Sequence, residues 1–94
     1  MKNNTQEWPQ EVAKKVEALK KEHGLDIVKV IRVEDKIAYL KKPDRPILKM
    51  ASSTADTRIE EAELLLENCW LDGDEIIKTD DDYFLNAMPF ILGL

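Results

Sequence analysis

The first apolar repeat in the chain follows Trp8-Pro9 and has the spacing of a helix. Val12, Val16 and Leu19 recur at intervals of four and three residues, and Ala13 widens the stripe. Proline suits a first helical turn because the N–H that it lacks would be unpaired there. Gly24 stands where a left-handed C-cap is needed. The pattern predicts a helix between these signals, preceded by a flexible polar segment at residues 1–8.

Between Leu25 and Lys42 the apolar period changes to two, which is typical of β-strands. The apolar positions are Ile27, Val28, Val30, Ile31, Val33, Ile37, Tyr39 and Leu40. Glu34-Asp35-Lys36 supplies a short polar connection, so we expect an antiparallel hairpin. Two strands alone are marginal in water, so this hairpin must be backed by helices or extended by strands from another copy.

Pro43-Asp44-Arg45-Pro46 ends the sheet, because proline donates no hydrogen bond to a strand ladder. A short helix is expected next, containing Ile47, Leu48, Met50 and Ala51, and it fades in Ser52-Ser53-Thr54.

A longer helix is predicted from Thr57 to about Leu71. Thr57 and Glu60 have the spacing of a capping box. At 100° per residue one broad stripe holds the expected core residues, which are Ile59, Ala62, Leu65, Leu66, Cys69 and Trp70. Leu64 and Leu71 fall on a flank and form a second apolar ridge. Either a neighbouring helix or a partner protein covers this ridge.

The acidic segment after this helix is explained without a metal. Asp72-Gly73-Asp74-Glu75 is a predicted turn, and Ile76-Ile77 is a predicted extended link. Thr79 is the expected cap of a last helix whose first turn holds Asp80-Asp81-Asp82, where carboxylates are favourable. As a calcium loop the segment fails, because it ends on Tyr83 where a bidentate Glu is required.

The last predicted helix, from Tyr83 to Leu94, is apolar around most of its circumference. Its apolar members are Tyr83, Phe84, Leu85, Ala87, Met88, Phe90, Ile91, Leu92 and Leu94. Pro89 predicts a kink or break, because it removes a backbone bond to Leu85. So wide an apolar surface is either buried in the monomer or covered by a partner protein.

Composition limits the function classes. The chain has 94 residues and a net charge of −5, which suits a single domain over residues 1–94. Residues 1–49 hold 12 basic and 8 acidic residues, whereas residues 50–94 hold 2 basic and 11 acidic residues. The acidic half argues against binding to a nucleic acid backbone. No apolar run has the length of a membrane span, and no secretory signal is visible, so we expect a cytoplasmic protein.

No catalytic constellation is visible in the sequence. His23 has no partner of suitable spacing, Cys69 is single and reads as a small buried hydrophobe, and there is no glycine-rich phosphate loop. We therefore expect neither enzyme activity nor a cofactor nor a bound metal. Lys14, Lys15 and Lys21 are expected on the solvated face of the first helix.

Two stretches of the chain resemble a known family. They run from Ile37 to Arg45, with the text YLKKPDR, and from Glu63 to Ile76, with LLENCW followed by GDE. Together with the acidic start of the last apolar helix, they resemble the small tail assembly chaperones of long-tailed bacteriophages and related prophages. The resemblance covers about residues 27–92. The lysine-bearing first helix departs from the family pattern.

The resemblance implies a non-enzymatic chaperone of the bacterial host cytoplasm. Such a chaperone binds the tape-measure protein and shields its long hydrophobic helix until tail-tube subunits polymerise around it. Family members commonly self-associate, and the family supplies no catalytic residues.

We therefore expect an α+β fold with an N-terminal helix, an antiparallel β-hairpin and two to three C-terminal helices. Contact with the tape-measure or tail-tube protein is expected at Leu64, Leu71, Phe84, Met88, Phe90, Ile91 and Leu92. Two alternatives stay open. One is a structural or adaptor protein of a phage or mobile element, and the other is a small acidic regulatory protein that occupies a basic site on its partner.

Overall fold

Helices cover both faces of a central antiparallel sheet. The computed structural model describes residues 10–94, so the segment 1–8 that was expected to be flexible lies outside the described residues. The elements in chain order are α1 (Gln10–His23), β1 (Val28–Val33), β2 (Lys36–Lys41), α2 (Arg45–Thr54), α3 (Arg58–Cys69), β3 (Trp70–Gly73), α4 (Ile76–Thr79) and α5 (Asp81–Leu92). The predicted α+β architecture is confirmed, with a third strand added to the hairpin.

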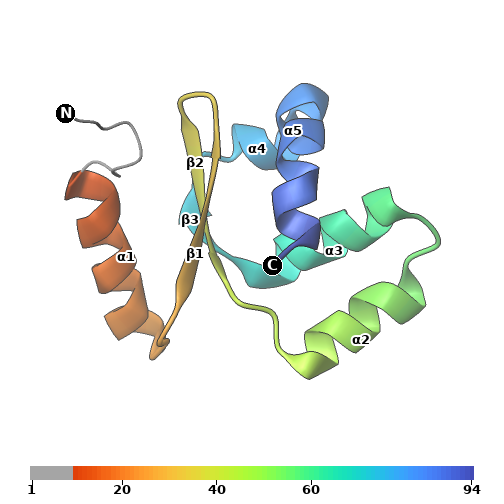
Figure 1. The fold of residues 1–94 in the computed structure, drawn as a ribbon, viewed down its shortest axis with the longest axis horizontal. Coiled ribbons are helices and arrows are strands. Elements are labelled where there is room, and N and C mark those ends of the chain that lie inside the picture. Colours follow the sequence, from red (N-terminus) through yellow and green to blue (C-terminus); the bar gives the residue numbers. More distant parts are fainter. Residues whose placement is uncertain (1–9) are drawn as a thin grey trace.

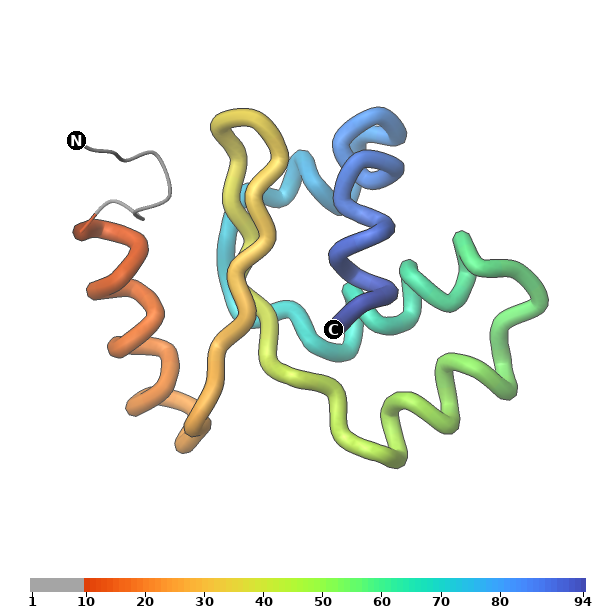
Figure 2. Tube along the Cα trace, in the orientation of Figure 1, coloured from red at the N-terminus to blue at the C-terminus, as the bar shows by residue number. Residues whose placement is uncertain are grey.

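The two helical layers differ in size. In the view of Figure 1 the sheet is seen nearly edge-on, with α1 alone on its left and α2, α3 and α5 on its right. The chain path in Figure 2 leaves the hairpin for α2 and α3, returns to the sheet as β3, and leaves it again for α4 and α5. Thus β3 connects two parts of the larger helical layer.

Helix α1 ends as its sequence predicts. Gly24 adopts a positive φ of 64°, and the Leu25 N–H donates to the Lys20 carbonyl at 2.8 Å, which closes the last turn. Val12 and Leu19 are buried against Tyr39 of β2. This small cluster fixes α1 to its own face of the sheet.

The hairpin is confirmed, and its third strand comes from the same chain. Val33 pairs with Lys36, so Glu34-Asp35 is a two-residue turn, and Glu34 has a φ of 56°. Strand β3 pairs with β2 on the side away from β1, with Gly73 opposite Ala38. The hairpin was expected to be backed by helices or extended by strands from another copy; helices do pack against it, and the additional strand comes from the same chain.

The prediction of a helix to Leu71 was wrong at its end. Helix α3 stops at Cys69, because Trp70 turns into an extended conformation with φ −62° and ψ 127°. Residues 70–73 then gain main-chain partners on β2 instead of a last helical turn. Leu71 consequently packs in the cluster beneath α1 rather than beside α3.

The main core lies between the sheet and the larger helical layer. Alternate strand residues point into it, namely Ile31, Val33, Ala38 and Leu40. The helices contribute Ala51, Ala62, Leu65, Leu66, Cys69, Ile77, Ala87 and Ile91. Cys69 is fully buried, and burial raises the pKa of its thiol. It therefore acts as a small core hydrophobe.

Side chains cap the first turns of α2 and α3, and the cap predicted at Thr57 is confirmed. The Ile47 N–H donates to the Asp44 carboxylate at 3.0 Å, and the Glu60 N–H donates to the Thr57 hydroxyl at 3.1 Å. The Glu60 carboxylate accepts from the Asp56 N–H at 3.0 Å, one residue before the position of a standard capping box. The placement of Ile59 in the core was wrong, since this residue of the first turn is 48% exposed.

The segment before the last helix was also mispredicted. Ile76 and Ile77 begin the single-turn helix α4 rather than an extended link, and Ile77 is fully buried. The cap of α5 is Asp80 rather than Thr79, because the Asp80 carboxylate accepts from the Asp82 and Tyr83 N–H groups at 2.9 and 3.1 Å. Helix α5 continues through Pro89 to Leu92, so the chain does not break there.

Candidate functional site

The seven residues expected to contact a partner do not form one surface. Ile91 has no exposed surface and belongs to the core, so its expected role as a contact was wrong for this fold. Leu64 lies on α3 beside the main core, whereas Leu71 lies on β3 in the cluster beneath α1. The ridge expected from these two leucines does not exist, because Leu71 packs on the face of the sheet that α1 covers, whereas Leu64 packs against the main core on the other face.

The remaining four residues belong to α5, and most of that helix is covered by the monomer. Phe84, Met88 and Leu92 are half-buried against the main core, and Phe90 is 59% exposed. Leu85, which was not among the expected contacts, is 51% exposed. The wide apolar surface of α5 is therefore mainly core, with two large side chains left in solvent.

A shallow apolar hollow lies between α3 and α5. Ile59 from the first turn of α3 and Phe84 and Leu85 from α5 line it, and Glu63 and Asp81 stand at its rim. Its volume is about 290 Å³. Two of its three apolar residues are about half exposed, which makes it accessible to a side chain from another protein.

A second hollow of about 240 Å³ continues along α3. Glu63 lines both hollows, and the second is completed by Thr54, Ala55, Glu60, Leu64 and Glu67. We refer to the residues lining these two hollows as the α3 face. Leu64 and Phe84, two of the expected contacts, both lie on it.

The α3 face carries negative charge without compensation. Glu60, Glu63, Glu67 and Asp81 line it, and neither hollow is lined by a lysine or arginine of the described chain. Within residues 10–94, none of these four carboxylates forms an ion pair. The face thus combines exposed apolar side chains with an acidic rim.

Sequence reasoning identified two of the four large apolar residues of this face, Leu64 and Phe84, and missed Ile59 and Leu85. Ile59 was assigned to the core because its helical angle matches the core stripe, and periodicity gives the direction of a side chain but not where the core ends. Leu85 was noted only as part of an apolar helix. The sequence signal for the exposure of Ile59 is its position only two residues after the cap Thr57. This end of α3 lies away from the sheet (Figure 1).

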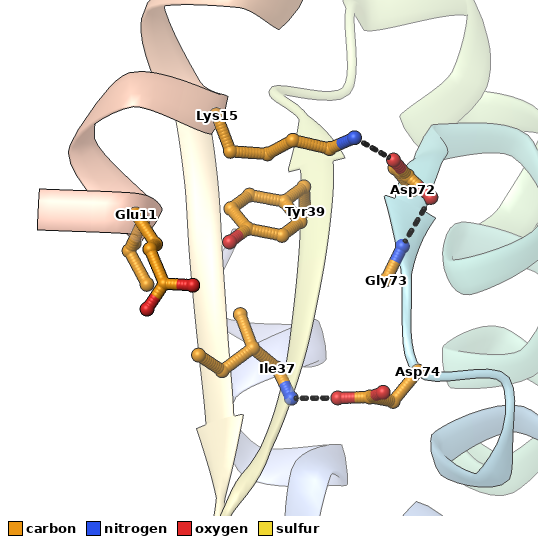
Figure 3. A pocket seen from close by; sticks show the side chains of 8 residues that line it. Glu11, Lys15, Ile37, Tyr39, Asp72, Gly73 and Asp74 are labelled. Atoms are coloured by element: carbon orange, nitrogen blue, oxygen red, sulfur yellow. Dashed lines mark hydrogen bonds and ion pairs between the residues drawn. The ribbon is translucent and has the colours of Figure 1, made fainter. Parts of the chain in front are cut away.

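A polar pocket lies on the other side of the sheet, between α1 and strands β2 and β3 (Figure 3). It is an open cavity of about 400 Å³, with Glu11 at its rim and Tyr39 among its lining residues. Lys15 forms an ion pair with Asp72, whose carboxylate also accepts from the Gly73 N–H at 2.8 Å. Both side chains of the pair are nearly half exposed, at 43% and 45%, so its contribution to stability is small.

The pKa values of Lys15, Tyr39 and Asp72 in this pocket are shifted, each in the direction that favours its ordinary charge state. The hydrogen bond and charge of Asp72 raise the pKa of Lys15, and the hydrogen bonds from Lys15 and Gly73 lower the pKa of Asp72. Burial raises the pKa of Tyr39. These shifts hold an ammonium, a carboxylate and a neutral phenol at neutral pH, so none of the three is poised to exchange a proton there. The pair links α1 to β3.

Two further features bear on the chemistry of the chain. No group of three or more His, Cys, Asp or Glu residues in the described part of the chain is placed to hold a metal ion. No helix within residues 10–94 combines the length and apolarity needed to cross a bilayer.

Comparisons with known proteins give no relative. A scan against protein-family models, a search of curated proteins and a search of solved structures each returned no match.

Proposed function

We propose that this chain is a non-enzymatic tail assembly chaperone of a phage or prophage. It binds the tape-measure protein in the bacterial host cytoplasm and keeps its apolar surface covered until tail-tube subunits assemble. The observation that carries the proposal is the α3 face, where Ile59 and Leu85 are half exposed in one shallow hollow. Shallow apolar surfaces of this kind suit protein segments, whereas small ligands favour deep, enclosed clefts. The family resemblance supplies the client.

The two alternatives make different demands on the same face. An adaptor protein would remain in the finished particle, whereas a chaperone leaves it, so purified particles distinguish the two roles. A small acidic regulator is favoured by the four carboxylates of the α3 face. Its binding would depend mainly on charge and would persist when the apolar residues of the face are replaced.

The chaperone proposal predicts that the Leu85→Asp variant no longer binds the tape-measure protein. A charge in the hollow is unfavourable for an apolar contact, so retention in a pull-down should fall about tenfold or more. Leu48→Asp on α2 is the matched control, because Leu48 is 46% exposed and lines neither hollow of the α3 face. It should retain the client as the wild type does. Wild-type retention by folded Leu85→Asp would contradict the proposal, and circular dichroism checks the fold of both variants.

Self-association belongs to the same proposal, and the edge of β1 supports it. The strand order β1-β2-β3 leaves β1 at one edge of the sheet, and no helix or strand of residues 10–94 lies in front of it in Figure 1. The Ile37 N–H donates to the Asp74 carboxylate and the Ile37 carbonyl accepts from the Asp74 N–H, both at 2.8 Å, on the side away from β1. Arg32, opposite Ile37, therefore directs its own main-chain groups outward, as do Val28 and Val30 by alternation. A second copy of β1 can pair with these groups.

The pairing of two β1 edges predicts that Arg32→Pro abolishes self-association. Proline removes the outward N–H but no bond of the hairpin ladder, and it is tolerated at such edge positions. Arg32→Ala removes the side chain and keeps the N–H, so this control should still dimerise. Sedimentation velocity measures both. An Arg32→Pro protein that is folded and dimeric, or a wild type that is monomeric at high concentration, would overturn this part of the proposal.

A further inference from the structure

We infer that the α3 face binds a basic amphipathic helix. This inference rests on the proposed function for the role of the bound segment as client, and it adds the chemistry of that segment. Its apolar side chains contact the three apolar residues of the first hollow and Leu64 in the second, and its lysines or arginines meet the carboxylates that line both hollows.

The charge of the partner follows from the rim of the α3 face. Four carboxylates line the same two hollows as the apolar residues Ile59, Leu64, Phe84 and Leu85. An acidic partner would bring like charges together while water is excluded, which weakens binding and slows association. Residues 50–94 hold 11 acidic and 2 basic residues, so the field around the face also attracts a basic segment from a distance.

The helical form of the partner follows from the main chain. The α3 face is built mainly from two helices, α3 and α5, most of whose main-chain groups are bonded within the helix or to its cap residue. An extended segment on this face would lose water from its own N–H and C=O groups and find few main-chain partners. A helix bonds its own N–H and C=O groups internally. It therefore presents only side chains to the α3 face, and side chains are what the hollows can bind.

The spacing of the face also fits a helix. Glu60 and Glu67 lie two turns apart along α3, about 10 Å, and Glu63 lies between them where the two hollows meet. A partner helix with apolar residues at positions i, i+3, i+4 and i+7 contacts the apolar residues of the first hollow and Leu64 in the second with one stripe. Basic residues beside that stripe then lie within reach of the glutamates.

Three synthetic peptides of about 20 residues test the inference, a length that supports a helix. The first has a leucine stripe flanked by lysines, the second replaces every lysine by glutamate, and the third has the first composition with the stripe scrambled. Fluorescence anisotropy at low and high salt measures their binding to the full chain. The first peptide should bind about tenfold or more tightly than the other two, and added salt should weaken it. Equal binding of the first and second peptides, or of the first and third, would overturn the inference.

Charge reversal locates the binding on the α3 face. Glu63→Lys should weaken the basic peptide about tenfold and improve the acidic one. Glu22→Lys, an equally exposed reversal on α1, makes the same change in net charge at the other end of the molecule and should have little effect. Equal losses in the two variants would mean that only net charge matters, which overturns the assignment to this face.

The failure of this inference can be distinguished from the failure of the proposed function. If the peptides behave as expected but the tape-measure protein does not bind, the chaperone role fails and the recognition of a basic helix stands. If the tape-measure protein binds through Leu85 but the peptides show no preference for basic charge, the chaperone role stands and this inference fails.

Discussion

Replacing Gly73 by alanine should destabilise the protein more than any other single methyl addition at a glycine. Gly73 has a φ of 134°, which side chains rarely adopt. An added Cβ would lie 2.5 Å from the Ile37 carbonyl oxygen and 2.8 Å from the Ala38 Cα. Both atoms belong to the backbone of β2, so neither can move without opening the sheet. We expect a loss of about 3 kcal/mol or more in the free energy of unfolding.

Urea denaturation of Gly73→Ala and Gly24→Ala checks this expectation. Gly24 also has a positive φ, 64°, but an added Cβ there meets no atom within 4 Å. Its replacement should therefore cost only the left-handed strain, about 1 kcal/mol. Equal losses at the two positions would show that the close approach of β3 to β2 is not required for stability.

The position of Gly73 also connects stability to the candidate site. Immediately after it, Asp74 bonds both main-chain groups of Ile37, and the chain then turns into α4 and α5. The contact of β3 with β2 thus determines where α5 begins. Because α5 supplies Phe84 and Leu85 to the α3 face, a loosened β3 should also weaken client binding.

The elements that the sequence predicted well are those whose signals are local. Gly24 ends α1 with its positive φ, and Thr57 begins α3 by accepting a hydrogen bond from the Glu60 N–H. The hairpin likewise follows from a short polar connection between alternating strands. Such signals need no knowledge of the rest of the fold.

The elements that were missed depend on distant partners. Strand β3 has four residues, and its sequence continues the pattern of the preceding helix, so only pairing with β2 distinguishes the two conformations. Helix α4 was also missed because of a distant contact, since the side chain of Ile77 packs in the main core. A local pattern cannot show a pairing partner that lies about thirty residues away.

The candidate site was partly predictable for the same reason. Leu64 and Phe84 were expected contacts, and both lie on the α3 face. Whether these two residues lie next to Ile59 depends on how α3 packs beside α5. The apolar periodicity of either helix does not show this packing. The apolar circumference of α5 suggested a large interface, but the main core accounts for most of it.

The neighbouring residues Ile91 and Phe90 give the second large prediction. Both belong to α5 and both were expected to contact a partner, but Ile91 is fully buried and Phe90 is 59% exposed. Ile91→Ala should lower the free energy of unfolding by about 2 to 5 kcal/mol, because it leaves a cavity in the main core. Phe90→Ala should cost less than about 1 kcal/mol, since most of its ring already contacts water.

Urea denaturation of the two alanine variants distinguishes a core position from a surface position within one turn of α5. The unfolding slopes should match the wild type, so that the midpoints report stability alone. The opposite order of losses would mean that α5 presents another face to the sheet, and the α3 face would then lose Phe84 and Leu85. Because Ile91 supports the fold, its replacement cannot serve as a binding test, whereas Phe90 and Leu85 can be changed without emptying the core.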